Sequence, residues 1–125
     1  MKILKKNLKE FPVASDSGSL RSLKNTDELV KLRDTFIIFD YPETNDKYQM
    51  GYCLVYPGGK TGGHTHDNAE EVYHIIDGRA KMIVGEEEFE VEAGDTFIIP
   101  AQKIHTTLNP FNRPVKFFWC VINKK

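Results

Sequence analysis

Short apolar segments separated by turn residues follow one another from about residue 36 to the end of the chain. Within residues 87–92, "EEFEVE", apolar and charged residues alternate, which is typical of a strand with one face toward solvent. "TFIIFDY" and "VKFFWCVI" are rich in the β-branched and aromatic residues that favour strands. Asp77-Gly78 is typical of a tight hairpin turn between two such strands. This regular spacing predicts an all-β sandwich or barrel.

Alternation groups residues by face, but at the last segment it leaves open which face is buried. The interior there receives either Phe117, Trp119 and Val121 or Phe118, Cys120 and Ile122.

The first 35 residues lack this strand pattern. "FPVASDSGSLRS" has the composition of turns and loops. Residues 25–34, "NTDELVKLRD", fit either a short helix with Leu29 and Leu32 on one face or part of an edge strand. We therefore expect an irregular N-terminal extension over residues 1–35 and one barrel domain over residues 36–125.

Composition narrows the class of protein. The chain has 125 residues, a formal net charge of -1 and 40% hydrophobic residues, which fits one soluble globular domain. Its scattered lysines and arginines give no basic patch for nucleic acid, and no apolar run is long enough to cross a bilayer. Cys53 and Cys120 are far apart, so we predict reduced thiols and a cytoplasmic location.

The candidate chemistry begins with two histidines one residue apart, His64 and His66. On a strand both imidazoles would point to the same face, which makes half of a metal site. Glu70 and Glu71 follow, and His105 comes from a second hairpin. Three imidazoles and one carboxylate suit a divalent ion such as Mn, Fe, Co, Ni or Zn. Counting ligand charges leaves a surplus of about +1, which attracts anionic oxygen ligands.

These two stretches resemble the paired motifs of the cupin superfamily. The first motif, G-x5-H-x-H-x3or4-E-x6-G, is matched by Gly58, His64, His66, Glu71 and Gly78. The second, G-x5-P-x-G-x2-H-x3-N, is matched by Gly94, Pro100, His105 and Asn109, with Gln102 in place of the middle glycine.

The resemblance implies a double-stranded β-helix, which is a jelly-roll barrel of antiparallel strands. It assigns one divalent transition metal to His64, His66, Glu71 and His105. It also implies a homodimer formed through the outer strands, in which residues 1–35 could take part.

We expect a small-molecule metalloenzyme: an isomerase, decarboxylase, lyase or dioxygenase acting on a sugar or keto acid. Tyr73 shares a strand face with Glu71 and could transfer a proton or simply pack. Lys60 and Arg113 lie on mouth loops, where they could contact substrate or remain surface charges. The alternative function is a non-catalytic module that binds or senses a metal or small ligand. Neither function involves nucleic acid or a membrane.

Overall fold

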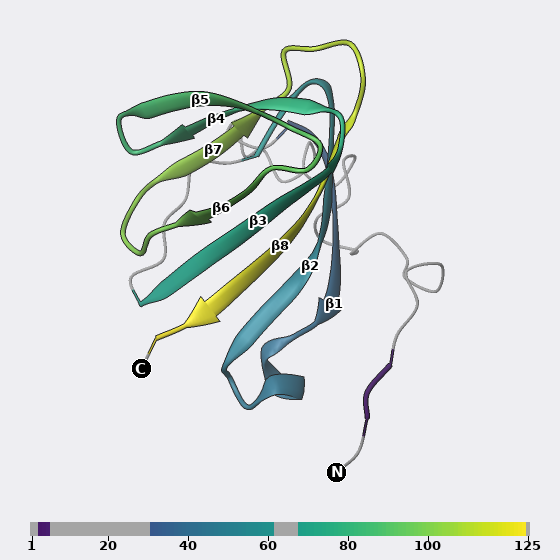
Figure 1. Ribbon diagram of the computed structural model, residues 1–125. Coiled ribbons are helices and arrows are strands. Elements are labelled where there is room, and N and C mark those ends of the chain that lie inside the picture. Colours follow the sequence, from purple (N-terminus) through teal and green to yellow (C-terminus); the bar gives the residue numbers. More distant parts are fainter. Residues whose placement is uncertain (1–2, 6–30, 62–67, 125) are drawn as a thin grey trace.

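The computed structural model describes residues 3–5, 31–61 and 68–124 (Figure 1). In chain order the elements are β1 (Lys31–Phe39), η2 (a 3-10 helix, Tyr41–Thr44), β2 (Tyr48–Lys60), β3 (Ala69–Asp77), β4 (Arg79–Val84), β5 (Glu87–Glu92), β6 (Thr96–Ile99), β7 (His105–Leu108) and β8 (Val115–Asn123). The predicted all-β class is confirmed. Within the described part of the chain, no helix has the length and apolar character needed to span a membrane.

The strands form one curled antiparallel sheet. Its order is β5-β4-β7-β2-β8-β3-β6, and β1 pairs with β2. In Figure 1, β6, β3, β8, β2 and β1 fan out side by side, while β4, β5 and β7 form a second group. The long strand β2 links the groups, because it pairs with β8 along most of its length and with β7 at Lys60. Across the remaining seam, Phe89 of β5 meets Phe97 of β6 edge to face, with ring centroids 5.7 Å apart.

The apolar core lies inside this curl. On β8, Val115, Phe117, Trp119 and Val121 are buried, which settles the alternative that the sequence left open. Alternate residues on β2, β3 and β4 complete the core together with Val91 of β5 and Ile99 of β6, because the pleat sends every second side chain inward. The candidate site residues on these strands therefore lie either on the inner face or on the outer face of the sheet.

Strand β1 begins at Lys31, five residues before the predicted start of the barrel. It pairs with β2, so the edge-strand alternative holds for residues 31–34, and residues 25–30 lie outside the described part. Ile37 packs against the core, and Thr35 on the same face donates a hydrogen bond to the Cys53 sulfur at 3.7 Å. Cross-strand packing on β2 thus overrides the local helical pattern.

Asn109 fixes the loop between β7 and β8. Its side-chain nitrogen donates to the carbonyls of Val55 and Arg113, each at 2.8 Å, and its side-chain oxygen accepts from the Phe111 N–H at 3.0 Å. Asn109 is 1% exposed, so these bonds form in a dry environment where each partner is needed.

Candidate metal centre

A carboxylate and an imidazole meet inside the barrel. Glu71 comes from the start of β3 and His105 is the first residue of β7, two strands that do not pair with each other. The Oε1 atom of Glu71 lies 2.9 Å from Nε2 of His105, and the two side chains are 6% and 1% exposed. Two ionisable groups are buried this deeply only when they neutralise each other or share a cation.

The neighbouring candidates on β3 point the other way. Glu70 lies on the outer face and forms an ion pair with Lys124, with 3.5 Å between the charged atoms. His74 is exposed, and its Nδ1 lies 2.7 Å from the Thr96 hydroxyl on β6. Adjacent residues of the same type therefore occupy opposite faces of one strand, as strand alternation requires.

The hydrogen bonding of His105 favours metal binding at Nε2. Its Nδ1 lies 3.4 Å from the Lys103 carbonyl, which can only accept, so Nδ1 carries the proton. The ring then turns its Nε2 toward the Glu71 carboxylate, which is the orientation in which an imidazole ligates a metal through Nε2. At 2.9 Å from each other, the two donor atoms are close enough to bind one ion.

The other two predicted ligands, His64 and His66, lie outside the described residues. Thr61, the last described residue before them, is buried against β7, where its N–H donates to the Thr107 carbonyl at 2.9 Å. The next described residue is Asn68, three residues before Glu71. The described residues alone bring together no group of three or more His, Cys, Asp or Glu side chains. A site with three or more such ligands would therefore need side chains outside the described residues, where the predicted His64 and His66 lie.

Two other ionisable groups near the pair are held in their neutral forms. Tyr73 is 2% exposed and stacks on Phe117, with ring centroids 4.6 Å apart. Burial, followed by the nearby Glu71 charge, raises the pKa of the Tyr73 hydroxyl well above its usual value. Burial also raises the pKa of the Cys53 thiol to about 12. Neither group is a base or a thiolate nucleophile near neutral pH, although the Tyr73 hydroxyl can donate a hydrogen bond.

Arg113 and Lys60 are not brought to the pair. The Arg113 guanidinium is 73% exposed and lies 3.7 Å from Asp77, the last residue of β3. Asp77 is six residues beyond Glu71, about 20 Å along an extended strand. Lys60 alternates with buried Gly59 and Thr61, so its side chain belongs to the outer face.

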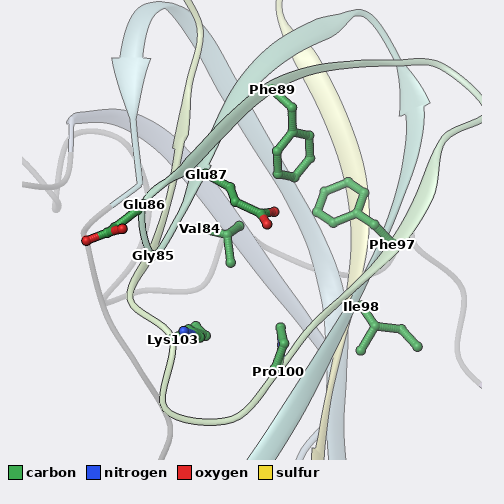
Figure 2. A pocket seen from close by; sticks show the side chains of 9 residues that line it. All are labelled: Val84, Gly85, Glu86, Glu87, Phe89, Phe97, Ile98, Pro100 and Lys103. Carbon is green, nitrogen blue, oxygen red and sulfur yellow. The ribbon is translucent and has the colours of Figure 1, made fainter.

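A cavity of about 650 Å³ opens between the β4–β5 turn and the loop from β6 to β7. Figure 2 shows the rings of Phe89 and Phe97 at one end and Lys103 and Pro100 at the other. Phe97 contacts Tyr73, with centroids 5.4 Å apart, and Tyr73 contacts His105 at 6.1 Å. One wall of the cavity therefore continues into the site. Sequence reasoning did not identify this cavity, because its lining comes from two turns and a seam between strands that do not pair.

Comparisons with known proteins agree with this architecture. The cupin domain family matches residues 51–121. An uncharacterized protein of Methanocaldococcus jannaschii is 39% identical over 74 residues, 59% of each chain. Mannose-1-phosphate guanylyltransferase of Salmonella muenchen is 30% identical over 78 residues, 62% of this chain and 16% of that enzyme. The chain thus spans less than two thirds of either relative.

A cupin-2 domain protein from Rhodospirillum rubrum has the same fold, with a TM-score of 0.70. The superposition covers 100% of this chain and 78% of that one, at 18% identity. At this identity the likeness concerns the fold alone.

Proposed function

The chain belongs to the cupin domain family, and on this premise we propose that it is a metal-dependent protein acting on a small, oxygen-rich molecule. One observation carries the proposal: Glu71 and His105, from separate strands, meet 2.9 Å apart in the interior. Their carboxylate oxygen and imidazole nitrogen are donors that divalent transition metals accept. Glu71 stands at a ligand position of the first family motif and His105 at a ligand position of the second.

In this proposal His64, His66, Glu71 and His105 hold one divalent transition metal, such as Mn, Fe, Co, Ni or Zn. When bound, such an ion supplies Lewis-acid chemistry: it polarises a substrate oxygen and favours negative charge developing there. The Lys103 carbonyl orients the His105 ring through Nδ1. Tyr73 remains protonated, so its role is to donate a hydrogen bond to a substrate oxygen and to exclude water from the pair.

The reaction classes that fit are isomerisation, decarboxylation, lyase chemistry and dioxygenation. A sugar or keto acid is the proposed substrate class, because both offer adjacent oxygens to one ion. The sugar alternative gains support from the Salmonella relative, whose name places mannose 1-phosphate among its substrates. We place the protein in the cytoplasm, since Cys53 and Cys120 are free thiols.

A second candidate function is a binding or sensing module without turnover. It is favoured by the packing of Tyr73, the candidate for proton transfer, which is 2% exposed and stacks on Phe117 as part of the core. A protein that only binds needs hydrogen-bond donors and no base.

Matched replacements on neighbouring residues test the metal proposal. Elemental analysis of the purified protein should find about one transition-metal ion per chain. Glu71→Gln and His105→Ala should each lose most of that metal, because each removes a buried ligand. The controls Glu70→Gln and His74→Ala change the same residue types on the outer face and should keep it. Equal metal content in all four variants would exclude the proposed coordination.

A turnover screen separates the two functions. The metal-loaded protein is incubated with a panel of sugars, sugar phosphates and keto acids, and products are followed by mass spectrometry. Turnover that disappears in His105→Ala and persists in His74→Ala supports the enzyme. Saturable binding of a panel member without any product supports the binding module.

A further inference from the structure

Arg33 lies on the inner face of β1. It lies opposite Val55 on β2, just as Thr35 lies opposite Cys53 and Ile37 opposite Gly51. Thr35 and Ile37 both contact the interior, through the Cys53 sulfur and the apolar core. Since side chains two apart share a face, Arg33 is directed to the same interior.

Arg33 is half-buried, and one of its polar atoms is not used by the described fold. Its Nε is buried and has no hydrogen-bond partner among the described residues. The adjacent Asp34 points to the other face, where it accepts a hydrogen bond from the Tyr56 hydroxyl at 2.7 Å. A buried guanidinium donor without a partner is costly, so a fold does not retain it for packing alone.

The inner face that carries Arg33 continues to the site. Thr35, on the same face, lies opposite Cys53, and Cys53 lies opposite Phe117, whose ring stacks on Tyr73 with centroids 4.6 Å apart. Arg33 therefore shares this interior with Tyr73, which contacts His105. The planar guanidinium offers paired N–H donors that match two oxygens of one oxyanion.

We propose that Arg33 binds the anionic group, a carboxylate or a phosphate, of the molecule that this interior accepts. The inference rests on the proposed function, since it takes the interior as the ligand site, and it narrows the substrate class to oxyanions. Arg33 is therefore a specificity-determining residue. The reacting oxygens of the ligand lie toward Glu71 and His105, and its anionic group lies at Arg33. A neutral sugar or ketone lacks the group that Arg33 recognises.

Calorimetric titration of the metal-loaded protein tests this inference. The probes are pyruvate and mannose 1-phosphate, with hydroxyacetone and mannose as their uncharged counterparts. Arg33→Met should weaken binding of the preferred anion by about tenfold or more, since a hydrogen-bonded charge is lost. Binding of the uncharged probes should not change. The better of the two anions distinguishes a carboxylate from a phosphate.

Two controls keep the result specific. Arg79→Met removes an exposed guanidinium that lies 4.0 Å from the centre of the Phe111 ring, and it should leave anion binding unchanged. Arg33→Lys keeps the positive charge and should retain part of the anion binding, and it serves if the methionine variant does not fold. Circular dichroism checks folding of each variant.

The outcomes separate this inference from the metal proposal. Loss of anion binding in Arg33→Met, with full metal content, supports the role of Arg33. Equal anion binding in wild type and Arg33→Met, or no binding of either anion to metal-loaded wild type, overturns that role and leaves the metal site standing. Absence of metal from wild-type protein overturns the proposed function itself.

Discussion

At the scale of single residues, the Asn109 side chain makes three hydrogen bonds that hold the loop before β8 to β2. It joins the β2 carbonyl of Val55 to the loop that leads into β8, using both donors and its acceptor. Asn109→Ala removes all three bonds and leaves the buried Val55 carbonyl without this donor, so we expect the free energy of unfolding to fall by about 2–4 kcal/mol. Urea denaturation measures the loss.

The neighbouring Asn112 provides the matched control for this change. Its side chain is exposed, so Asn112→Ala should alter the free energy of unfolding by less than about 0.5 kcal/mol. An equally small effect at Asn109 would show that water replaces its hydrogen bonds.

Gln102 occupies a backbone conformation that suits glycine. Its φ is 67°, and it stands where the second cupin motif has glycine, so the turn is preserved although the residue differs. The left-handed conformation costs a non-glycine residue about 1–2 kcal/mol, and glycine's extra chain entropy returns about 0.5–1 kcal/mol of that. We therefore expect Gln102→Gly to raise the free energy of unfolding by about 0.5–1 kcal/mol.

Gln102→Ala is the comparison for this stabilising change. It removes the same side chain and keeps the backbone cost, so its urea midpoint should not rise above that of wild type. A gain in both variants would assign the effect to the glutamine side chain.

The sequence predicted which side chains face the interior where strand alternation and motif spacing agree. Glu71 faces the interior and Glu70 does not, and only the six-residue spacing to Gly78 distinguished them beforehand. Arg33 was missed because residues 25–34 fit a helical pattern, so no strand parity was applied to it. Once β1 is known, its spacing from Ile37 places it inside.

At the scale of elements, the β3–β4 hairpin is pressed against the start of β8. Gly78 turns the chain with φ 85°, and a Cβ built there would lie 2.4 Å from the Pro114 carbonyl oxygen. Gly94, in the β5–β6 turn, has φ 98° but open space around it. The two glycines separate backbone strain from steric overlap.

Alanine at each position measures the two effects. Gly94→Ala should cost about 1–2 kcal/mol of unfolding free energy, because only the backbone conformation is unfavourable. Gly78→Ala should cost at least about 1 kcal/mol more, since the hairpin must also move away from β8. Equal losses in urea denaturation would mean that the hairpin shifts without cost.

Element prediction succeeded where strands were long or bounded by turn residues, as for the hairpin at Asp77-Gly78. It was incomplete at β7, "HTTL", a strand that the pattern did not predict and that begins at His105. Four residues carry too little alternation to be recognised locally. Pairing with β4, in which His105 lies opposite Val84, makes this segment a strand.

At the scale of the whole molecule, both faces of the curled sheet carry apolar side chains. The inner face is the apolar core, yet the outer face of β3, β6 and β8 also carries exposed apolar side chains. These are Ile76, Ile98 and Ile122, which are 38%, 63% and 40% exposed. Ile98 lies opposite Val72, and Val72 lies opposite Cys120, the outer-face neighbour of Ile122 on β8. Such a row of apolar side chains on an outer surface is typical of an interface between proteins. The expected homodimer through the outer strands is the partner we propose for this face.

Replacing one residue of this face with a charge tests the dimer. In Ile122→Lys a lysine would be buried on the two-fold interface, facing another apolar surface, so the dimer should dissociate at higher protein concentration than wild type. Analytical ultracentrifugation over a concentration series measures the shift. Ile104→Lys is the control, because Ile104 is 59% exposed but lies in the loop between β6 and β7, off this face. A wild-type protein that stays monomeric throughout the series would contradict the proposed dimer. Dissociation caused only by Ile104→Lys would instead place the interface at the end of the barrel that holds the cavity.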